Sequence, residues 1–135
     1  MANSVIKRLV LNSSKIYRFY VNPGAVASGD TPELTSSYLK DNLFSVESGK
    51  IKSNYSGIVQ IVTHVVGSSS NRLWYKVKGG NAEPQILMYG AYASGDSVQV
   101  AQISTNTEIY LEFLDAFTVG GGNTGSSYIF ITILD

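Results

Sequence analysis

Hydrophobic and polar residues alternate along most of this chain with a period of two, which is typical of half-buried β-strands. Clusters of Gly, Ser and Asn interrupt the alternation at intervals like those of all-β sandwiches and barrels. β-Branched and aromatic residues enrich the intervening segments, as they do in strands. The pattern therefore predicts an all-β fold. The predicted strands are Ile6–Leu11, Ile16–Val21, Gly49–Ser53, Ile58–Val66, Arg72–Lys78, Gln85–Ala93, Ser97–Ile103, Glu108–Leu114 and Tyr128–Leu134.

One long segment, Asn22–Asn42, lacks the alternation and contains two prolines and two glycines near its start. We predict that it is irregular, with a short helical turn in its second half, Thr31–Lys40. Long loops in compact domains are functional or are packed by their own side chains. We therefore expect Met1–Asp41 to be integrated in the fold and to attach it to a larger assembly, while residues 42–135 form the body.

Three predicted strands are apolar on both of their faces. In Tyr128–Leu134 only Thr132 interrupts the hydrophobic sequence, and Ile58–Val66 and Glu108–Leu114 place apolar side chains on both sides. In a lone antiparallel sandwich one face of each strand meets water and should be polar. The second apolar layer needs a cover, and another copy of the chain supplies one at about 25 cal/mol per Å² of buried apolar surface. The pattern therefore predicts an obligate oligomer.

Composition narrows the function classes. The chain has 135 residues, enough for one domain with its own core. Ten basic residues balance ten acidic ones, and only 15% of residues are charged, which argues against an electrostatic nucleic-acid binder. The absence of cysteine excludes disulfides, thiolate zinc sites and cysteine nucleophiles. With a single histidine as well, we expect no metal and no cofactor.

Neither a signal peptide nor a membrane span is predicted. The first 15 residues hold a basic pair followed by a three-residue apolar run, which is far shorter than a signal-peptide core. The longest mostly apolar stretch, Gly57–Gly67, contains Gln60, Thr63 and His64 and is too short to cross a bilayer. We expect synthesis in a cytoplasm and no membrane partner.

From about Asn42 to Leu134 the sequence resembles the tumour-necrosis-factor-like (TNF-like) jelly-roll family, most closely the globular head of complement component one q. The resemblance depends on short motifs in the order of the family, each weak alone but fairly specific together. The motifs are GKIKSNYSGIVQIVTHV (Gly49–Val65), LWYKVKGG (Leu73–Gly80), ASGDSVQV (Ala93–Val100), EIYLEF (Glu108–Phe113) and SSYIFITIL (Ser126–Leu134).

The resemblance implies a ten-stranded antiparallel jelly-roll sandwich that assembles as a homotrimer. It also implies that the three doubly apolar strands lie together in the central sheet. Their outward side chains are then the predicted trimer interface, namely Ile58, Gln60, Val62, His64, Tyr110, Glu112, Leu114, Tyr128 and Phe130.

In style the chain is similar to the occurrences of this family in tailed bacteriophages, because it is small, cysteine-free and rich in Ser, Asn and Gly. We therefore expect a virion protein, made in the host cytoplasm, that acts as a structural or decoration module and binds other virion proteins. The alternative is a receptor-binding head that binds host saccharide. Fold alone does not decide between these functions.

Motifs with catalytic meaning are scarce. Gly120–Gly125, GGGNTG, has the spacing of a dinucleotide fingerprint, but it lies between two predicted strands and is interpreted as a loop. His64 is the one candidate base near neutral pH, yet it lies mid-strand with no nucleophile motif. We expect no enzymatic activity and place His64 at a subunit interface, where its protonation at about pH 6 is expected to loosen the assembly.

Recognition is expected in loops and around tyrosines, because rigid aromatic side chains beside Ser and Asn are typical of adaptable binding surfaces. Trp74 has two interpretations, a sugar-stacking platform or a core residue, and its place in LWYKV favours packing. The pairs Lys50 with Lys52 and Lys76 with Lys78 could meet an anionic surface, although solvated decoration is the simpler interpretation. The candidate ligand residues are Ser69, Asn71, Asn81, Tyr89, Tyr92 and Asn123.

Overall fold

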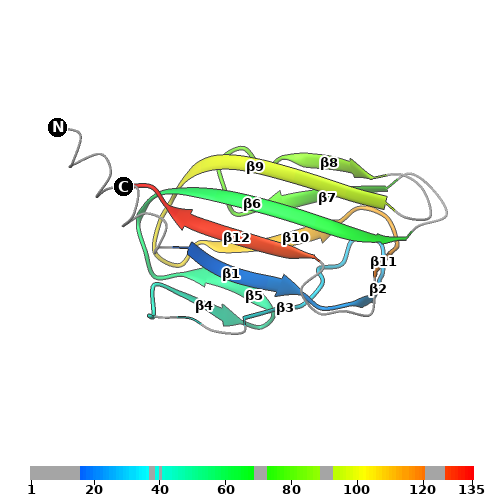
Figure 1. Cartoon of the computed structure of the whole chain (residues 1–135), viewed down its shortest axis with the longest axis horizontal. Coiled ribbons are helices and arrows are strands. Elements are labelled where there is room, and N and C mark those ends of the chain that lie inside the picture. Colours follow the sequence, from blue (N-terminus) through cyan, green and yellow to red (C-terminus); the bar gives the residue numbers. More distant parts are fainter. Residues whose placement is uncertain (1–15, 37–38, 40, 69–72, 89–92, 121–126) are drawn as a thin grey trace.

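Twelve strands and no helix make up the described part of the chain, which in this computed structural model comprises residues 16–36, 39, 41–68, 73–88, 93–120 and 127–135 (Figure 1). The predicted strand Ile6–Leu11 lies outside these residues. The strands are β1 Ile16–Val21, β2 Gly24–Val26, β3 Leu34–Thr35, β4 Phe44–Glu47, β5 Lys50–Ser53, β6 Gly57–Ser68, β7 Leu73–Lys78, β8 Gln85–Met88, β9 Ala93–Ile103, β10 Glu108–Phe113, β11 Phe117–Val119 and β12 Tyr128–Ile133.

Two antiparallel sheets face each other. The seven-stranded sheet has the order β2-β11-β6-β12-β1-β3, with β9 along the other edge of β6, and the five-stranded sheet has the order β4-β5-β10-β7-β8. In Figure 1, β1, β12, β6 and β9 run side by side in front of β10, β7 and β8. β1, β2 and β3, which lie before Asp41, all belong to the larger sheet, so the described part of this segment contributes strands to the sandwich.

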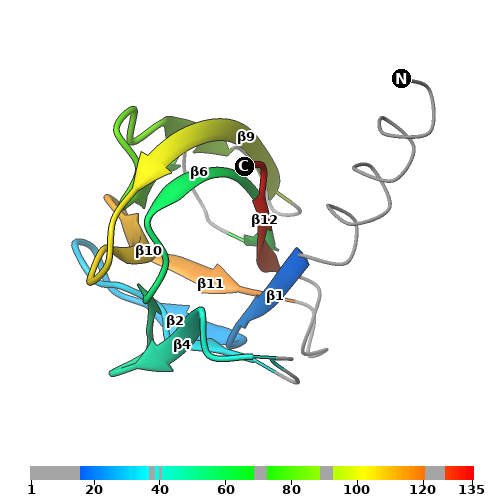
Figure 2. The ribbon, with the colours of Figure 1, turned by 90° about the vertical axis from the view of Figure 1, so that its left-hand side faces the viewer.

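The core fills the space between the sheets. Side chains alternate between the two faces of a strand, so one set from each strand points inward. In β12 these are Ile129, Ile131 and Ile133, each at most 2% exposed. Tyr17 and Phe44 lie in the same core, with their ring centroids 4.8 Å apart. The end-on view in Figure 2 shows the sheets curving around this interior.

Four short strands, β2, β3, β4 and β11, are missing from the sequence prediction. They have two to four residues each, too few for an alternation to be recognised. The helical turn predicted in Thr31–Lys40 is wrong over Leu34–Thr35, since β3 pairs there with β1. The twelve strands also exceed the ten implied by the family resemblance.

One strand lies in the other sheet from the one expected. β10 pairs with β5 and β7 in the five-stranded sheet, whereas β6 and β12 lie in the seven-stranded sheet. The prediction that all three doubly apolar strands share one sheet is therefore wrong. Hydrophobicity along a strand shows that both faces are apolar, but it carries no information about the sheet to which the strand belongs.

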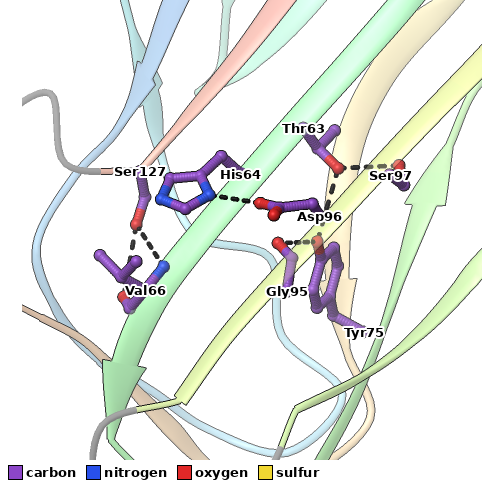
Figure 3. A network of polar contacts seen from close by, with 8 residues as sticks. All are labelled: Thr63, His64, Val66, Tyr75, Gly95, Asp96, Ser97 and Ser127. Carbon is purple, nitrogen blue, oxygen red and sulfur yellow. Dashed lines mark hydrogen bonds and ion pairs between the residues drawn. The ribbon is translucent and has the colours of Figure 1, made fainter.

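A buried polar network joins the two sheets behind β6 (Figure 3). The Thr63 hydroxyl lies 2.8 Å from the Ser97 hydroxyl and 3.4 Å from that of Tyr75, which donates to Gly95 O over 2.8 Å. Thr63 and Tyr75 are fully buried. These hydroxyls satisfy one another within the core, as buried polar groups require.

Gln99 is the exception to this rule. Its side chain points inward from β9, is 8% exposed, and neither its amide nitrogen nor its amide oxygen has a hydrogen-bond partner among the described residues. The amide lies against Gly80, where an added Cβ would come within 2.6 Å of Oε1. Gly80 therefore gives the amide its space but no hydrogen bond.

Replacing Gln99 by leucine is expected to stabilise the fold by about 1–3 kcal/mol, because it removes an unpaired buried amide and keeps a similar volume. Urea unfolding at fixed protein concentration measures the effect. The exposed Gln85 on β8 provides the control, since Gln85→Leu should leave the free energy of unfolding unchanged. A less stable Gln99→Leu protein would show that the amide is paired in solution.

Tyr75 makes the fold sensitive to alkaline pH. Burial is the main cause that raises its pKa to about 12 from 10.0, helped by the nearby charge of Asp96 and opposed by the Thr63 hydrogen bond. A tyrosine that ionises less readily when folded stabilises the protein fully below pH 10.0 and ceases to do so as the pH rises through about 12.

The free energy of unfolding should therefore fall between these pH values, and it should fall less steeply in Tyr75→Phe. Urea titrations across that range test this expectation. Tyr110→Phe, which changes an outward-facing tyrosine, should behave like the wild type. Identical slopes in the wild type and Tyr75→Phe would contradict the assignment.

Candidate self-association face

The outward side of the seven-stranded sheet carries the second apolar layer, which we call the apolar face. Strand pairing sets its side chains in rows across β1, β12, β6 and β9, because directly opposed residues point to the same side. One row is Tyr20, Tyr128, His64 and Asp96; the next is Arg18, Phe130, Val62 and Val98; the third is Ile16, Thr132, Gln60 and Val100; Ile58 and Gln102 follow.

Aromatic rings form one side of the apolar face. Tyr128 and Phe130 stack with their centroids 4.2 Å apart, and Tyr20 meets Phe130 edge-on at 6.3 Å. The Arg18 guanidinium lies 5.6 Å from the Phe130 ring centre, within cation–π range. These contacts hold the rings as an ordered surface on β1 and β12.

Aliphatic side chains form the other side of the apolar face, and they are strongly exposed. Val98 and Val100 on β9 are 65% and 61% exposed, and Ile58 on β6 is 41% exposed. Val98 lies opposite Val62, so a continuous apolar row runs from Phe130 to β9. Contiguous exposed apolar surface of this kind marks an interaction site.

The valines of β9 were not predicted as interface residues. Hydrophobicity alone would turn Val98 and Val100 inward and Ser97 and Gln99 outward. Pairing with β6 does the reverse, since Thr63 lies opposite Ser97 and Val62 lies opposite Val98. The Ser97 hydroxyl is accommodated in the core by Thr63. The sequence of β6 was the one signal that could have shown this orientation, because each β9 side chain points to the same side as the β6 residue opposite it.

His64 lies at the end of the apolar face, between Tyr128 and Asp96. Its Nδ1 group hydrogen-bonds Asp96 Oδ1 (Figure 3). Its ring centroid lies 5.2 Å from that of Tyr128. The side chains of His64 and Asp96 are 30% and 68% exposed. A protonated His64 would therefore face a carboxylate from β9 and an aromatic ring from β12.

The structure places the nine predicted interface residues on two opposite sides of the sandwich. Ile58, Gln60, Val62, His64, Tyr128 and Phe130 lie together on the apolar face. The other three, Tyr110, Glu112 and Leu114, point outward from the five-stranded sheet on the opposite side of the sandwich. A single interface on the apolar face therefore excludes these three residues.

Of the candidate ligand residues only Asn81 is described; Ser69, Asn71, Tyr89, Tyr92 and Asn123 lie outside the described residues. Asn81 is exposed in the β7–β8 turn, and its Oδ1 accepts a hydrogen bond of 3.1 Å from the backbone N–H of Gln102. It therefore binds the end of β9. The GGGNTG segment begins after β11 and ends before β12, between two strands as predicted.

Trp74 corrects another expectation. Packing in the core was favoured, but the side chain points outward from β7 and is 38% exposed, whereas its neighbour Tyr75 is fully buried. Register explains the difference, because Tyr75 lies opposite the core residue Phe113. The lysine pairs of β5 and β7 also face outward, and they are interleaved with Glu47, Glu108 and Glu112.

No helix of the described residues is long and apolar enough to cross a membrane. Over the same residues, no group of three or more His, Asp or Glu side chains is placed to hold a metal ion.

No protein-family model matches the chain, and no curated protein is similar to it in sequence. Solved structures do match. Murine APRIL at pH 8.5 has a TM-score of 0.66 at 14% identity, covering 89% of this chain and 100% of its own. Eiger TNF from S. frugiperda has a TM-score of 0.60 at 14% identity, with coverage of 89% and 92%. These similarities and the two-sheet topology show that the chain has the TNF-like jelly-roll fold.

Proposed function

We propose that this chain is a non-enzymatic protein that forms a homotrimer through the apolar face and serves as a structural or decoration module of a bacteriophage virion. The observation that carries the proposal is the exposure of Val98 and Val100, at 65% and 61%, beside the stacked rings of Tyr128 and Phe130. Burying these side chains against another copy removes apolar area from water at about 25 cal/mol per Å².

The number three comes from the family resemblance, and the TNF-like fold supports it. A closed, rotationally symmetric assembly buries the same surface in every copy. The rows of the apolar face suit such a contact, because their aromatic and aliphatic side chains can pack against another copy and their polar side chains can hydrogen-bond to it. Three linked copies would also bind a common partner together, so effective concentration would multiply weak contacts.

A non-enzymatic role agrees with the surroundings of His64. Its ring contacts Asp96 and Tyr128, and no serine or threonine hydroxyl of the described residues hydrogen-bonds it. A nucleophile activated by histidine would need such a contact. The pairing with Asp96 instead orients the ring at the edge of the apolar face.

The virion setting is supported by composition, since the chain is small, lacks cysteine and has few charges. We propose that other virion proteins bind near Met1–Asp41, whose described strands form part of the seven-stranded sheet. Mass spectrometry of purified particles from a phage encoding the chain would test this role. Detection in particles at a multiple of three copies supports it, and absence from particles contradicts it.

The double variant Val98→Asp/Val100→Asp should separate the subunits, because carboxylates would have to be buried in an apolar contact. We expect the wild type to sediment as a trimer at micromolar concentration. We expect the dissociation constant of the variant to rise by at least about tenfold, or about 1.4 kcal/mol.

Tyr110→Asp is the matched control, because it places a carboxylate on the opposite sheet beside Lys50. The control should remain trimeric, and circular dichroism should show that all three proteins are folded. A wild-type protein that stays monomeric at micromolar concentration would contradict the proposal. Dissociation of the Tyr110 variant alone would move the interface to the five-stranded sheet.

Host saccharide adhesion is the second candidate function. The observation that favours it lies on the opposite side of the sandwich from the apolar face, where Trp74 is 38% exposed on a sheet surface rich in polar side chains. A self-associated module would leave this side available for a ligand.

A further inference from the structure

We propose that the outer face of the five-stranded sheet carries a binding site for a neutral saccharide, with Trp74 as the platform on which a sugar ring stacks. The inference rests on the second candidate function and names its site and ligand class. The site lies within one subunit, so it does not depend on self-association.

Trp74 lies in the middle of a short apolar row across three strands. Leu87 of β8 lies opposite it on one side and Leu114, just after β10, on the other. Leu87 is 42% exposed and Leu114 is half-buried, so the indole is flanked but not covered. The flat side of an indole between such neighbours accepts the C–H face of a pyranose ring.

The backbone around Trp74 is firmly held. Its N–H donates to Asp115 Oδ2 over 3.2 Å, and its carbonyl accepts a 2.9 Å hydrogen bond from the N–H of Leu114. The Ser28 hydroxyl donates to Leu114 O over 2.8 Å. A platform fixed in this way loses little conformational entropy when a ligand binds.

The next row of the sheet supplies hydrogen-bonding groups. Glu112, Lys76 and Gln85 are directly opposed on β10, β7 and β8, one row from the Trp74 row. Within the described residues neither Lys76 nor Glu112 is in a salt bridge. A carboxylate, an ammonium and an amide beside an aromatic platform can both donate to and accept from sugar hydroxyls.

Charge favours a neutral ligand over an anionic one. Other lysines of this face already have partners: Lys52 pairs with Glu47 at 3.1 Å, Lys78 pairs with Glu83 at 3.0 Å, and Lys50 lies 4.2 Å from the Tyr110 ring centre. Lysines and glutamates alternate across the strands, so no basic patch remains for a polyanion.

The size of the apolar row favours a saccharide over a polypeptide. A stable protein interface buries about 800 Å² on each partner, with 20–30 residues a side. Here the row has three side chains, and the neighbouring row within the described residues, Glu112, Lys76 and Gln85, is polar and charged. An apolar spot of this size with a polar border matches one or two sugar rings.

Trp74 is the only tryptophan of the chain, so tryptophan fluorescence reports on this site alone. We would screen the wild-type protein on an array of neutral glycans built from glucose, galactose and N-acetylglucosamine, with heparin and sialylated glycans as anionic arms. The retained glycan would then be titrated. We expect saturable binding to neutral glycans, unaffected by salt, with a change in tryptophan emission.

Calorimetry with variants then tests the site. Trp74→Ala should weaken binding at least about tenfold and Glu112→Gln at least about threefold. Tyr110→Ala removes an aromatic ring of the same sheet that Lys50 covers, and it should bind like the wild type. Circular dichroism confirms that each variant is folded.

Four results would overturn the inference. Neutral-glycan binding that Trp74→Ala leaves intact would keep saccharide adhesion but move its site elsewhere. Binding of anionic glycans alone, lost in salt, would assign recognition to the lysines. An array with no bound glycan would exclude a saccharide, and a virion protein that wild type but not Trp74→Ala binds would identify a polypeptide partner instead. None of these results depends on the trimer measurement.

Discussion

The long antiparallel pairing between β6 and β9 determines most of what the molecule presents to its surroundings. The register runs from Gly57 opposite Ile103 to Gly67 opposite Ala93, so every side chain of β9 takes its side from β6. Because strand side chains alternate, a slip of one residue would exchange the core set with the surface set. The observed register buries Ser97 and Gln99 and exposes Val98 and Val100.

In β9, polar side chains therefore occupy core positions and apolar side chains occupy surface positions. The hydroxyl of Ser97 hydrogen-bonds that of Thr63, whereas the amide of Gln99 has no hydrogen-bond partner among the described residues. A contiguous patch of exposed apolar side chains is typical of a surface that another molecule covers. The polar core positions of β9 and the self-association proposed for the apolar face are therefore two consequences of one register.

Much of the fold could be predicted from alternation alone, and the limits of the prediction have physical causes. The all-β class and strands such as β1 and β12 are confirmed, because long amphipathic or doubly apolar segments carry a strong signal. The sheet of β10 and the side on which Trp74 lies depend on pairing between distant segments. β10 joins the five-stranded sheet because Glu108 lies opposite Lys52, far away along the chain. Trp74 faces outward because its neighbour Tyr75 lies opposite the distant core residue Phe113.

Asn81, in the turn between β7 and β8, occupies part of the edge of β9 that does not pair with β6. The carbonyls of Ile58 and Val66 accept hydrogen bonds from the N–H groups of Leu134 and Gly120, on the side of β6 away from β9. In an antiparallel pair, the β9 residues opposite Ile58 and Val66 therefore turn their own N–H and C=O groups toward the other edge of β9. An open edge is a template for adding strands without end. Asn81 Oδ1 accepts the hydrogen bond of the Gln102 N–H, so at this end of β9 that N–H is not available to an added strand.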